Sequence, residues 1–198
     1  MKRPIALFDF DNTLARGDSI VHLVKYGLKR YPLYIFYLIL TGVFYLGYLL
    51  HISSLERAKS NLLYPLRFMS EDELKDFYQK EVASHYYPHV IEELKQRKEE
   101  GCFVIVCTAS CETYMRYHDL PIDAMIGTIY ENGKIQGKNC RYENKVPRIL
   151  DCLSKNGIEI DYDRSYGYSD SDSDKPMLTL VKHKKRIMLK TGKIIEFK

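Results

Sequence analysis

Two acidic segments of the sequence carry residue types that could do chemistry, 9–13 and 168–174. Asp9 and Asp11 directly follow the apolar run 5–8, which predicts a buried parallel strand. Because side chains alternate along a strand, both carboxylates point to the same side where the chain leaves the sheet, the edge at which open parallel sheets place their chemistry. Crowded carboxylates repel each other unless a hard cation such as Mg²⁺ neutralises them. The pattern therefore indicates a site for Mg²⁺ and a phosphoryl group beside a carboxylate nucleophile.

Four segments, in the same order along the chain, resemble the motifs of the haloacid dehalogenase (HAD) superfamily. The matching residues are Asp9 and Asp11 in a D-x-D-x-T signature, Thr108 after the strand-like run 103–107, Lys145 at the start of a predicted helix, and Asp170 with Asp174. The fourth motif departs from the usual pattern, because Ser169 stands where the family more often has Gly. One D-x-D alone is weak evidence, but four ordered motifs on the expected elements are specific.

The resemblance implies a role for each catalytic residue. Asp9 would attack phosphorus and form an aspartyl-phosphate, and Asp11 would protonate the leaving alcohol and later activate water. Thr108, with Ser110 as a lesser candidate, would hydrogen-bond a phosphoryl oxygen, while Lys145 would neutralise negative charge. The family's dehalogenases attack carbon and do not keep the second aspartate as an acid or base. The presence of Asp11 therefore argues against dehalogenation.

The resemblance also implies a set of metal-site residues. Mg²⁺ would be held by the Asp9 carboxylate, the main-chain carbonyl of Asp11 and Asp170. Asp174 would support this shell by fixing bound water or Lys145. The run 170–174 lacks the glycine and distal glutamate of an EF-hand loop, which argues against calcium.

Asp18 is a candidate substrate-binding residue at the edge of the predicted cap. Phosphoserine phosphatases place a glutamate in this neighbourhood to meet the substrate's ammonium group. A helix N-cap role for Asp18 is an equal alternative. Arg57 is the nearest candidate partner for a substrate carboxylate, with a loose alignment.

The order of predicted elements indicates an α/β fold with a doubly wound, Rossmann-like parallel sheet. We expect a helix over 88–100, a strand over 102–107, a helix over 111–119, a helix from 145 to 156, and strands near 163–168 and 186–189. Residues 1–15 and 87–198 would form the catalytic core. The helical segment 16–86 interrupts the alternation and, by the resemblance, would be a cap of the class that includes phosphoserine phosphatases.

The stretch 31–50 contains no charged residue and follows Lys25, Lys29 and Arg30. Its length is compatible with a membrane-spanning helix, but its tyrosines and glycines, and a topology that must return to the core, argue against a span. We expect a packed hairpin within the cap. An exposed apolar face that touches a membrane or an apolar substrate is the intermediate alternative.

Composition narrows the classes of partner. The net charge of +4 is too small to argue for nucleic acid, and the basic run 182–186 is expected to be a solvated face. Five cysteines without C-x-x-C spacing indicate free thiols in a reducing cytoplasm. No secretory signal precedes the first predicted strand.

Three functions remain open at this point. The first is a Mg²⁺-dependent phosphomonoesterase acting on a small metabolite, phosphoserine-like or another. The second is a phosphatase of a lipid phosphate such as phosphatidylglycerophosphate. The third is a non-enzymatic binding protein with the same fold, which the intact set of Asp9, Asp11, Lys145 and Asp170 argues against.

Overall fold

A six-stranded sheet forms the centre of the computed structural model, which describes residues 2–197. The strands lie in the order β10-β9-β8-β2-β3-β4, and all neighbours are parallel except the β10–β9 pair. Their bounds are β2 Ile5–Phe8, β3 Phe103–Cys111, β4 Ala124–Thr128, β8 Tyr166–Ser169, β9 His183–Ile187 and β10 Ile194–Glu196. Two small ladders pair β1 (Lys2–Arg3) with β7 (Glu159–Ile160) and β5 (Tyr130–Glu131) with β6 (Lys134–Ile135).

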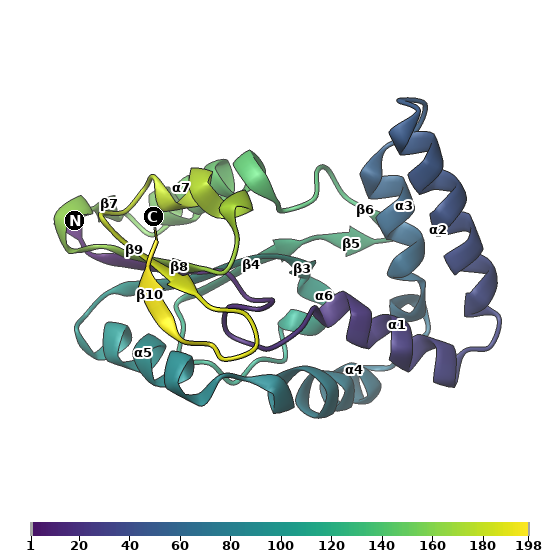
Figure 1. Ribbon diagram of the computed structural model, residues 1–198, viewed down its shortest axis with the longest axis horizontal. Coiled ribbons are helices and arrows are strands. Elements are labelled where there is room, and N and C mark those ends of the chain that lie inside the picture. Colours follow the sequence, from purple (N-terminus) through teal and green to yellow (C-terminus); the bar gives the residue numbers. More distant parts are fainter. Residues whose placement is uncertain (1, 198) are drawn as a thin grey trace.

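Helices cover both faces of this sheet (Figure 1). The α-helices are α1 Ser19–Arg30, α2 Tyr34–Leu49, α3 Leu55–Leu62, α4 Glu71–Phe77, α5 Pro88–Glu99, α6 Glu112–Met115, α7 Lys145–Lys155 and α8 Lys175–Leu178. In Figure 1, α5 lies below the sheet and α7 above it, while α2 and α3 stand apart at the right.

Alternation along β2 divides the core between the two faces. Ala6 and Phe8 join a buried cluster that includes Val90 of α5. Ile5 and Leu7 join the cluster on the opposite face, with α7 and α8. All four β2 side chains are fully buried, as expected for a central parallel strand covered on both sides. The predicted doubly wound architecture is confirmed.

The segment between β2 and α5 is helical, as expected, and its two ends lie side by side. Ala15 bridges to Asp11 on one side and to Tyr86 on the other. The amide of Arg16 donates to the carbonyl of His85 at 2.9 Å, and the amide of Tyr87 donates to that of Leu14 at 2.9 Å. Entry and exit of this insertion are therefore fastened to each other. The division into a core and a cap at 15/16 and 86/87 stays a prediction.

Several boundaries differ from those predicted. β3 continues past Cys107 to Cys111 through a register shift, so the second motif lies within a bulged strand and not behind its end. α6 is limited to four residues, Glu112–Met115, instead of 111–119. The basic run 182–186 is largely inside β9, half-buried, with Lys182 paired to Asp163 and Arg186 to Asp172. Lys182 is exposed and residues 183–186 are partly exposed, so the run remains in contact with solvent while it is paired within the sheet.

The uncharged stretch forms one arm of a helical hairpin. α2 packs along α3, and the hydroxyl of Tyr34 donates to the carbonyl of Leu62 at 2.6 Å. Gly47 is buried against the turn, because a Cβ at this position would lie 3.1 Å from Ser53 Cβ. No helix in the described part of the chain is long and apolar enough to cross a membrane. The expected hairpin is present, but it is packed on one side only.

Candidate active site

A buried ion cluster lies at the carboxyl end of β2. Lys145, the first residue of α7, places its Nζ 2.7 Å from Asp9 Oδ1 and 2.7 Å from Asp174 Oδ1. The Ser169 hydroxyl donates to the other Asp174 oxygen at 2.7 Å. Burial alone would lower the pKa of Lys145, but the two carboxylates outweigh it and the net shift is upward. Lys145 is thus a permanent cation aimed at Asp9, held in place by Asp174.

Asp9 keeps one carboxylate oxygen free of this ion pair. Burial raises the pKa of Asp9 to about 8, although Lys145 pulls it down, and Asp174 adds to the increase. An ionised Asp9 at neutral pH therefore needs more positive charge than Lys145 supplies.

Asp11 is held by the start of α1 and by β3. The Ser19 amide donates to Asp11 Oδ1 at 2.8 Å, and the Ser110 hydroxyl donates to Oδ2. The Ser19 hydroxyl lies 2.7 Å from that of Ser110 and 2.8 Å from that of Tyr114, which extends the network into the core. Burial raises the pKa of Asp11 to about 6, and Asp18 adds to the increase, while the hydroxyl and amide donors oppose it. A carboxyl poised near 6 can both give and take a proton.

Thr108 offers a hydroxyl to the cavity. It is buried, and its oxygen accepts a hydrogen bond from the Ser110 amide at 3.0 Å. The hydroxyl proton is therefore free to be donated to a phosphoryl oxygen. Ser110, the lesser candidate, is instead engaged with Asp11, to which its hydroxyl donates a hydrogen bond.

Asp170 follows β8 beside the Asp9 loop. The Thr13 hydroxyl accepts from the Asp170 amide at 3.1 Å and lies 3.4 Å from its Oδ1, which fastens the first and fourth motifs together. Burial raises the pKa of Asp170 as well. Asp172, by contrast, is exposed and pairs with Lys175 at 3.3 Å, as expected for a solvated side chain.

These residues fit a divalent cation. Among residues 2–197, no three His, Cys, Asp or Glu side chains are placed as a metal-binding group. The predicted ligand set needs only two carboxylates, Asp9 and Asp170, because Asp11 contributes a main-chain carbonyl. Burial disfavours the charged forms of both carboxylates, and a hard cation with oxygen ligands removes that cost. Both Asp174 oxygens are already used, one by Lys145 and one by Ser169, and its supporting role in the metal site stays a prediction.

A cavity of about 360 Å³ lies over Asp9 and Asp11, between the α2–α3 hairpin and the sheet. Its lining includes Asp18, Lys59 and Arg141. Asp18 is the N-cap of α1, since one carboxylate oxygen accepts from the Ile20 amide at 2.9 Å. The other oxygen is available to the cavity, so the two predicted roles of Asp18 are compatible.

Lys59 connects the helical hairpin to the core. Its Nζ donates to the Ala109 carbonyl at 2.7 Å and to Asn139 Oδ1 at 2.8 Å. Burial lowers its pKa, with Asp11 and Asp18 acting in the opposite direction. Arg141 stacks on the Tyr142 ring, 4.5 Å from its centroid. Among the described residues, neither Lys59 nor Arg141 forms an ion pair with a carboxylate.

The sequence did not point to Lys59, Asn139 and Arg141 as residues of the cavity. Arg57, the candidate partner for a substrate carboxylate, lies outside the cavity. Arg57 is exposed, sits 4.8 Å from the centroid of the Phe44 ring, and lines a different hollow. The structure does bring Asp9, Asp11, Asp18, Thr108 and Ser110 to one cavity. Lys59 lies two residues after Arg57 on α3, and the sequence carries no local signal that shows which of these two cations faces the cavity.

The chain is similar to proteins of known sequence or structure along most of its length. A histidinol-phosphatase from Neisseria meningitidis serogroup C (strain 8013) is 27% identical over 203 residues, covering 89% of this chain and 86% of the relative. A protein of unknown function from Bordetella pertussis Tohama I superposes with a TM-score of 0.75 at 23% identity, over 93% of this chain and 89% of that one. A substrate-bound phosphoserine phosphatase gives a TM-score of 0.61 at 14% identity, over 93% and 85% of the two chains.

The family model of the haloacid dehalogenase-like hydrolases matches residues 6–179. This match spans all four motif segments and most of the chain. It confirms the resemblance read from the sequence, the α/β fold, and an enzyme of the hydrolase class in place of a non-enzymatic binding protein. The chain therefore belongs to the haloacid dehalogenase-like hydrolase family.

Proposed function

We propose that the protein is a Mg²⁺-dependent phosphomonoesterase that works through an aspartyl-phosphate intermediate on a small phosphorylated metabolite. The observation that carries this proposal is the Asp9–Lys145 pair at 2.7 Å, at the base of a cavity that also presents Asp11 and Thr108. The histidinol-phosphatase relative and the phosphoserine phosphatase structures support hydrolysis of a phosphate ester.

The first half-reaction transfers the phosphoryl group to the enzyme. The free oxygen of Asp9 attacks phosphorus, and the bond from phosphorus to the ester oxygen breaks. Asp11 gives its proton to the departing alcohol, for which a pKa near 6 is suitable. Thr108 donates to a phosphoryl oxygen, and Lys145 balances the negative charge of Asp9 and the phosphoryl group.

The second half-reaction returns the enzyme to its starting state. Asp11, now ionised, takes a proton from water as that water attacks phosphorus, and the acyl-phosphate bond to Asp9 breaks. Asp9, the Asp11 main-chain carbonyl and Asp170 would hold Mg²⁺, which when bound supplies positive charge to the phosphoryl oxygens.

The charged residues of the cavity favour a phosphoserine-like substrate. Asp18 supplies a carboxylate oxygen for an ammonium group, while Lys59 and Arg141 supply positive charge for a carboxylate. Closure of the hairpin over this cavity would exclude water and strengthen these interactions.

A lipid phosphate is a second candidate, favoured by the apolar part of the cavity lining. Tyr45 of α2 contributes there, with Leu55 and Leu62 of α3. These side chains offer a wall to an acyl or glyceryl group beside the phosphate.

A reducing cytoplasm stays our prediction for the location of the protein. All five cysteine thiols are free.

Phosphate release with and without Mg²⁺ tests both candidates. The panel contains phosphoserine, histidinol phosphate, glycerol phosphate and phosphatidylglycerophosphate in detergent micelles. Preference for phosphoserine supports the role of Lys59 and Arg141, because histidinol phosphate has an amine but no carboxylate. Asp9→Asn is the matched control, and hydrolysis that survives this change contradicts the covalent route.

A further inference from the structure

The outer side of α2 is an exposed apolar stripe. Leu33, Phe36, Ile39, Val43, Leu46 and Leu50 recur every three or four residues, and each exposes between 58% and 70% of its surface. We call these six residues the α2 outer face. The opposite side of the helix, with Tyr34 and Gly47 buried, packs against α3 and its turn.

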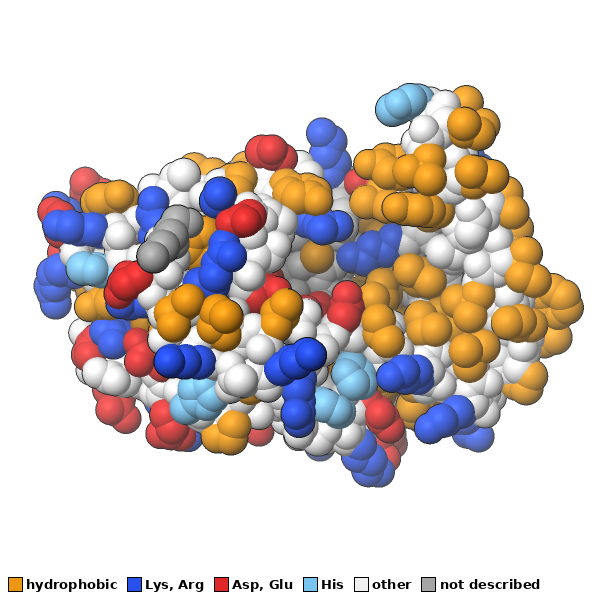
Figure 2. All heavy atoms as spheres, in the orientation of Figure 1, with side chains coloured by type: hydrophobic (Ala, Val, Ile, Leu, Met, Phe, Trp, Pro, Cys, Tyr) orange, Lys and Arg blue, Asp and Glu red, His pale blue; other side chains and the backbone are white. Residues whose placement is uncertain are grey.

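This distribution is unusual for a helix at the surface of a protein. A surface helix ordinarily turns polar and charged residues outward, and an apolar helix is ordinarily covered on all sides. α2 has no charged residue, and Figure 2 shows its apolar side chains as a continuous area at the right of the molecule, reaching the hollow beside the core. Exposed apolar areas of this kind mark contact with a partner or a membrane.

Positive charge is concentrated in the same part of the chain. Residues 19–67, from α1 to the turn after α3, contain six Lys or Arg and one Glu, a net charge of +5. Since the whole chain carries +4, the remaining residues carry −1. Lys25, Lys29, Arg30, Arg57 and Arg67 are exposed. The apolar face is thus accompanied by cations, which suits an anionic partner.

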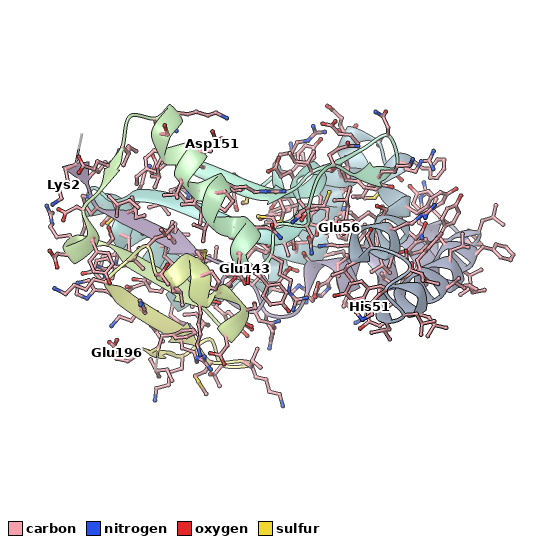
Figure 3. All side chains as sticks on the ribbon, turned by 90° about the horizontal axis from the view of Figure 1, so that it is seen from above. Lys2, His51, Glu56, Glu143, Asp151 and Glu196 are labelled. Atoms are coloured by element: carbon pink, nitrogen blue, oxygen red, sulfur yellow. The ribbon has the colours of Figure 1, made fainter. Side chains whose placement is uncertain are left out.

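Geometry favours a surface-lying helix over a spanning one. Sixteen residues of α2 measure about 24 Å, short of the roughly 30 Å hydrocarbon layer. Contacts near both ends, Tyr34 with Leu62 and Gly47 with Ser53, hold α2 along α3. Figure 3 places His51, which lies in the turn between α2 and α3, in the helical part of the molecule, away from Lys2 and Asp151 of the core. Such a hairpin can rest on a bilayer while the core remains in water.

We propose that the α2 outer face is a docking surface for an anionic lipid bilayer. Its apolar side chains enter the boundary between head groups and acyl chains, and the exposed Lys and Arg of 19–67 contact the lipid phosphates. A second copy of the chain fits less well, since it would bring two segments of charge +5 together. The same helix lines the cavity through Thr41 and Tyr45, so docking holds the cavity close to the membrane. The proposal does not depend on which ester the enzyme hydrolyses.

Flotation of the full-length protein with vesicles tests the proposal. One set contains phosphatidylcholine with 30 mol% phosphatidylglycerol, and the other contains phosphatidylcholine alone. The wild type is expected to bind the anionic vesicles at least ten-fold better, and raised salt is expected to weaken that binding. Ile39→Glu is expected to reduce it at least ten-fold, because the side chain is exposed and the new charge must enter the bilayer.

The matched control is Leu189→Glu, at an apolar residue that is 57% exposed in the turn between β9 and β10. It should bind like the wild type, and circular dichroism and hydrolysis of p-nitrophenyl phosphate should show that both variants are folded. Absence of wild-type binding, or equal binding by Ile39→Glu, overturns the proposal. Dissociation of a dimer by Ile39→Glu without vesicle binding overturns it in favour of a second copy. Inactive Asp9→Asn protein must still float, so a failure of the proposed enzymatic function remains distinguishable.

Discussion

Replacing Lys145 by Met should cost the protein a large part of its stability. The Lys145 side chain is 2% exposed, and its partners Asp174 and Asp9 are 3% and 13% exposed. Met keeps the length of the side chain but leaves the buried carboxyl groups of Asp9 and Asp174 without the ammonium group that both contact. Breaking a buried ion pair on one side costs about 3–5 kcal/mol, against a total stability of about 5–15 kcal/mol for a typical domain.

Urea unfolding followed by circular dichroism, in metal-free buffer at neutral pH, measures this loss. Lys145→Met/Asp174→Asn should lose less than Lys145→Met alone, since one of the two buried carboxyl groups has been replaced by a neutral amide.

Lys155→Met is the matched control on the same helix. Lys155 pairs with Asp151 at 2.7 Å, but its side chain is 73% exposed, so water replaces the partner and no measurable change is expected. A Lys145→Met protein within about 1 kcal/mol of the wild type at neutral pH would refute the reasoning. So would strict additivity of the two substitutions.

Three further predictions concern the cavity, the acid and two glycines. Lys59→Met should raise KM for phosphoserine roughly ten-fold, equivalent to about 1.4 kcal/mol, whereas Arg57→Met, outside the cavity, should leave steady-state kinetics unchanged. In metal-free protein, burial raises the pKa of Asp11 from 3.8 to about 6, so the native state binds this proton more readily than the unfolded state does. The free energy of unfolding should therefore fall as pH rises from about 4 to about 6, and urea titrations of Asp11→Asn should lack this contribution; a slope unchanged by the substitution contradicts it. Gly42→Ala should stabilise α2 by about 0.5–1 kcal/mol because a Cβ there meets nothing within 4 Å. Gly167→Ala should destabilise by about 1–3 kcal/mol because its Cβ would lie 2.6 Å from Leu178 Cδ2, and a thermal melt in which the two variants shift alike would contradict both.

The residues around Asp9 could be predicted because their positions follow local rules. Asp9 and Asp170 each follow an apolar strand, and parallel strands bring their carboxyl ends to one edge. Lys145 begins a helix whose start is visible in the sequence. The distance between Asp9 and Lys145 is long in sequence, 136 residues, but the topology of the sheet fixes it.

The cavity wall opposite Asp9 could not be predicted from such local rules. Lys59 meets Asn139 across 80 residues, through the packing of a helix against the β5–β6 hairpin region, and neither residue belongs to a periodic pattern. The continuation of β3 past Cys107 depends on a register shift against β4, which only the partner strand reveals.

The sequence left the exposure of α2 open, as the alternative to a hairpin packed within the cap, for a different physical reason. Hydropathy measures what a helix prefers to contact and does not count the neighbours available to it. An uncharged stretch such as 31–50 therefore favours burial. In the structure, one side of α2 is covered by other residues of the chain and the other side is exposed. The expected hairpin named no partner for the stretch 31–50, and in the structure α3 packs against one side of α2.

The bridge between Ala15 and Tyr86 makes the stability of the core nearly independent of the size of the inserted segment. Backbone contacts between residues 14–16 and 85–87 join the two ends of the inserted segment. These contacts involve none of the residues between them. Doubling the length of a flexible loop costs only about 0.6 kcal/mol of closure entropy. Helices can thus be lengthened, exchanged or added between these positions while Asp9 and Lys145 stay in place. In an evolving lineage, this junction lets the choice of substrate change at a different rate from the chemistry.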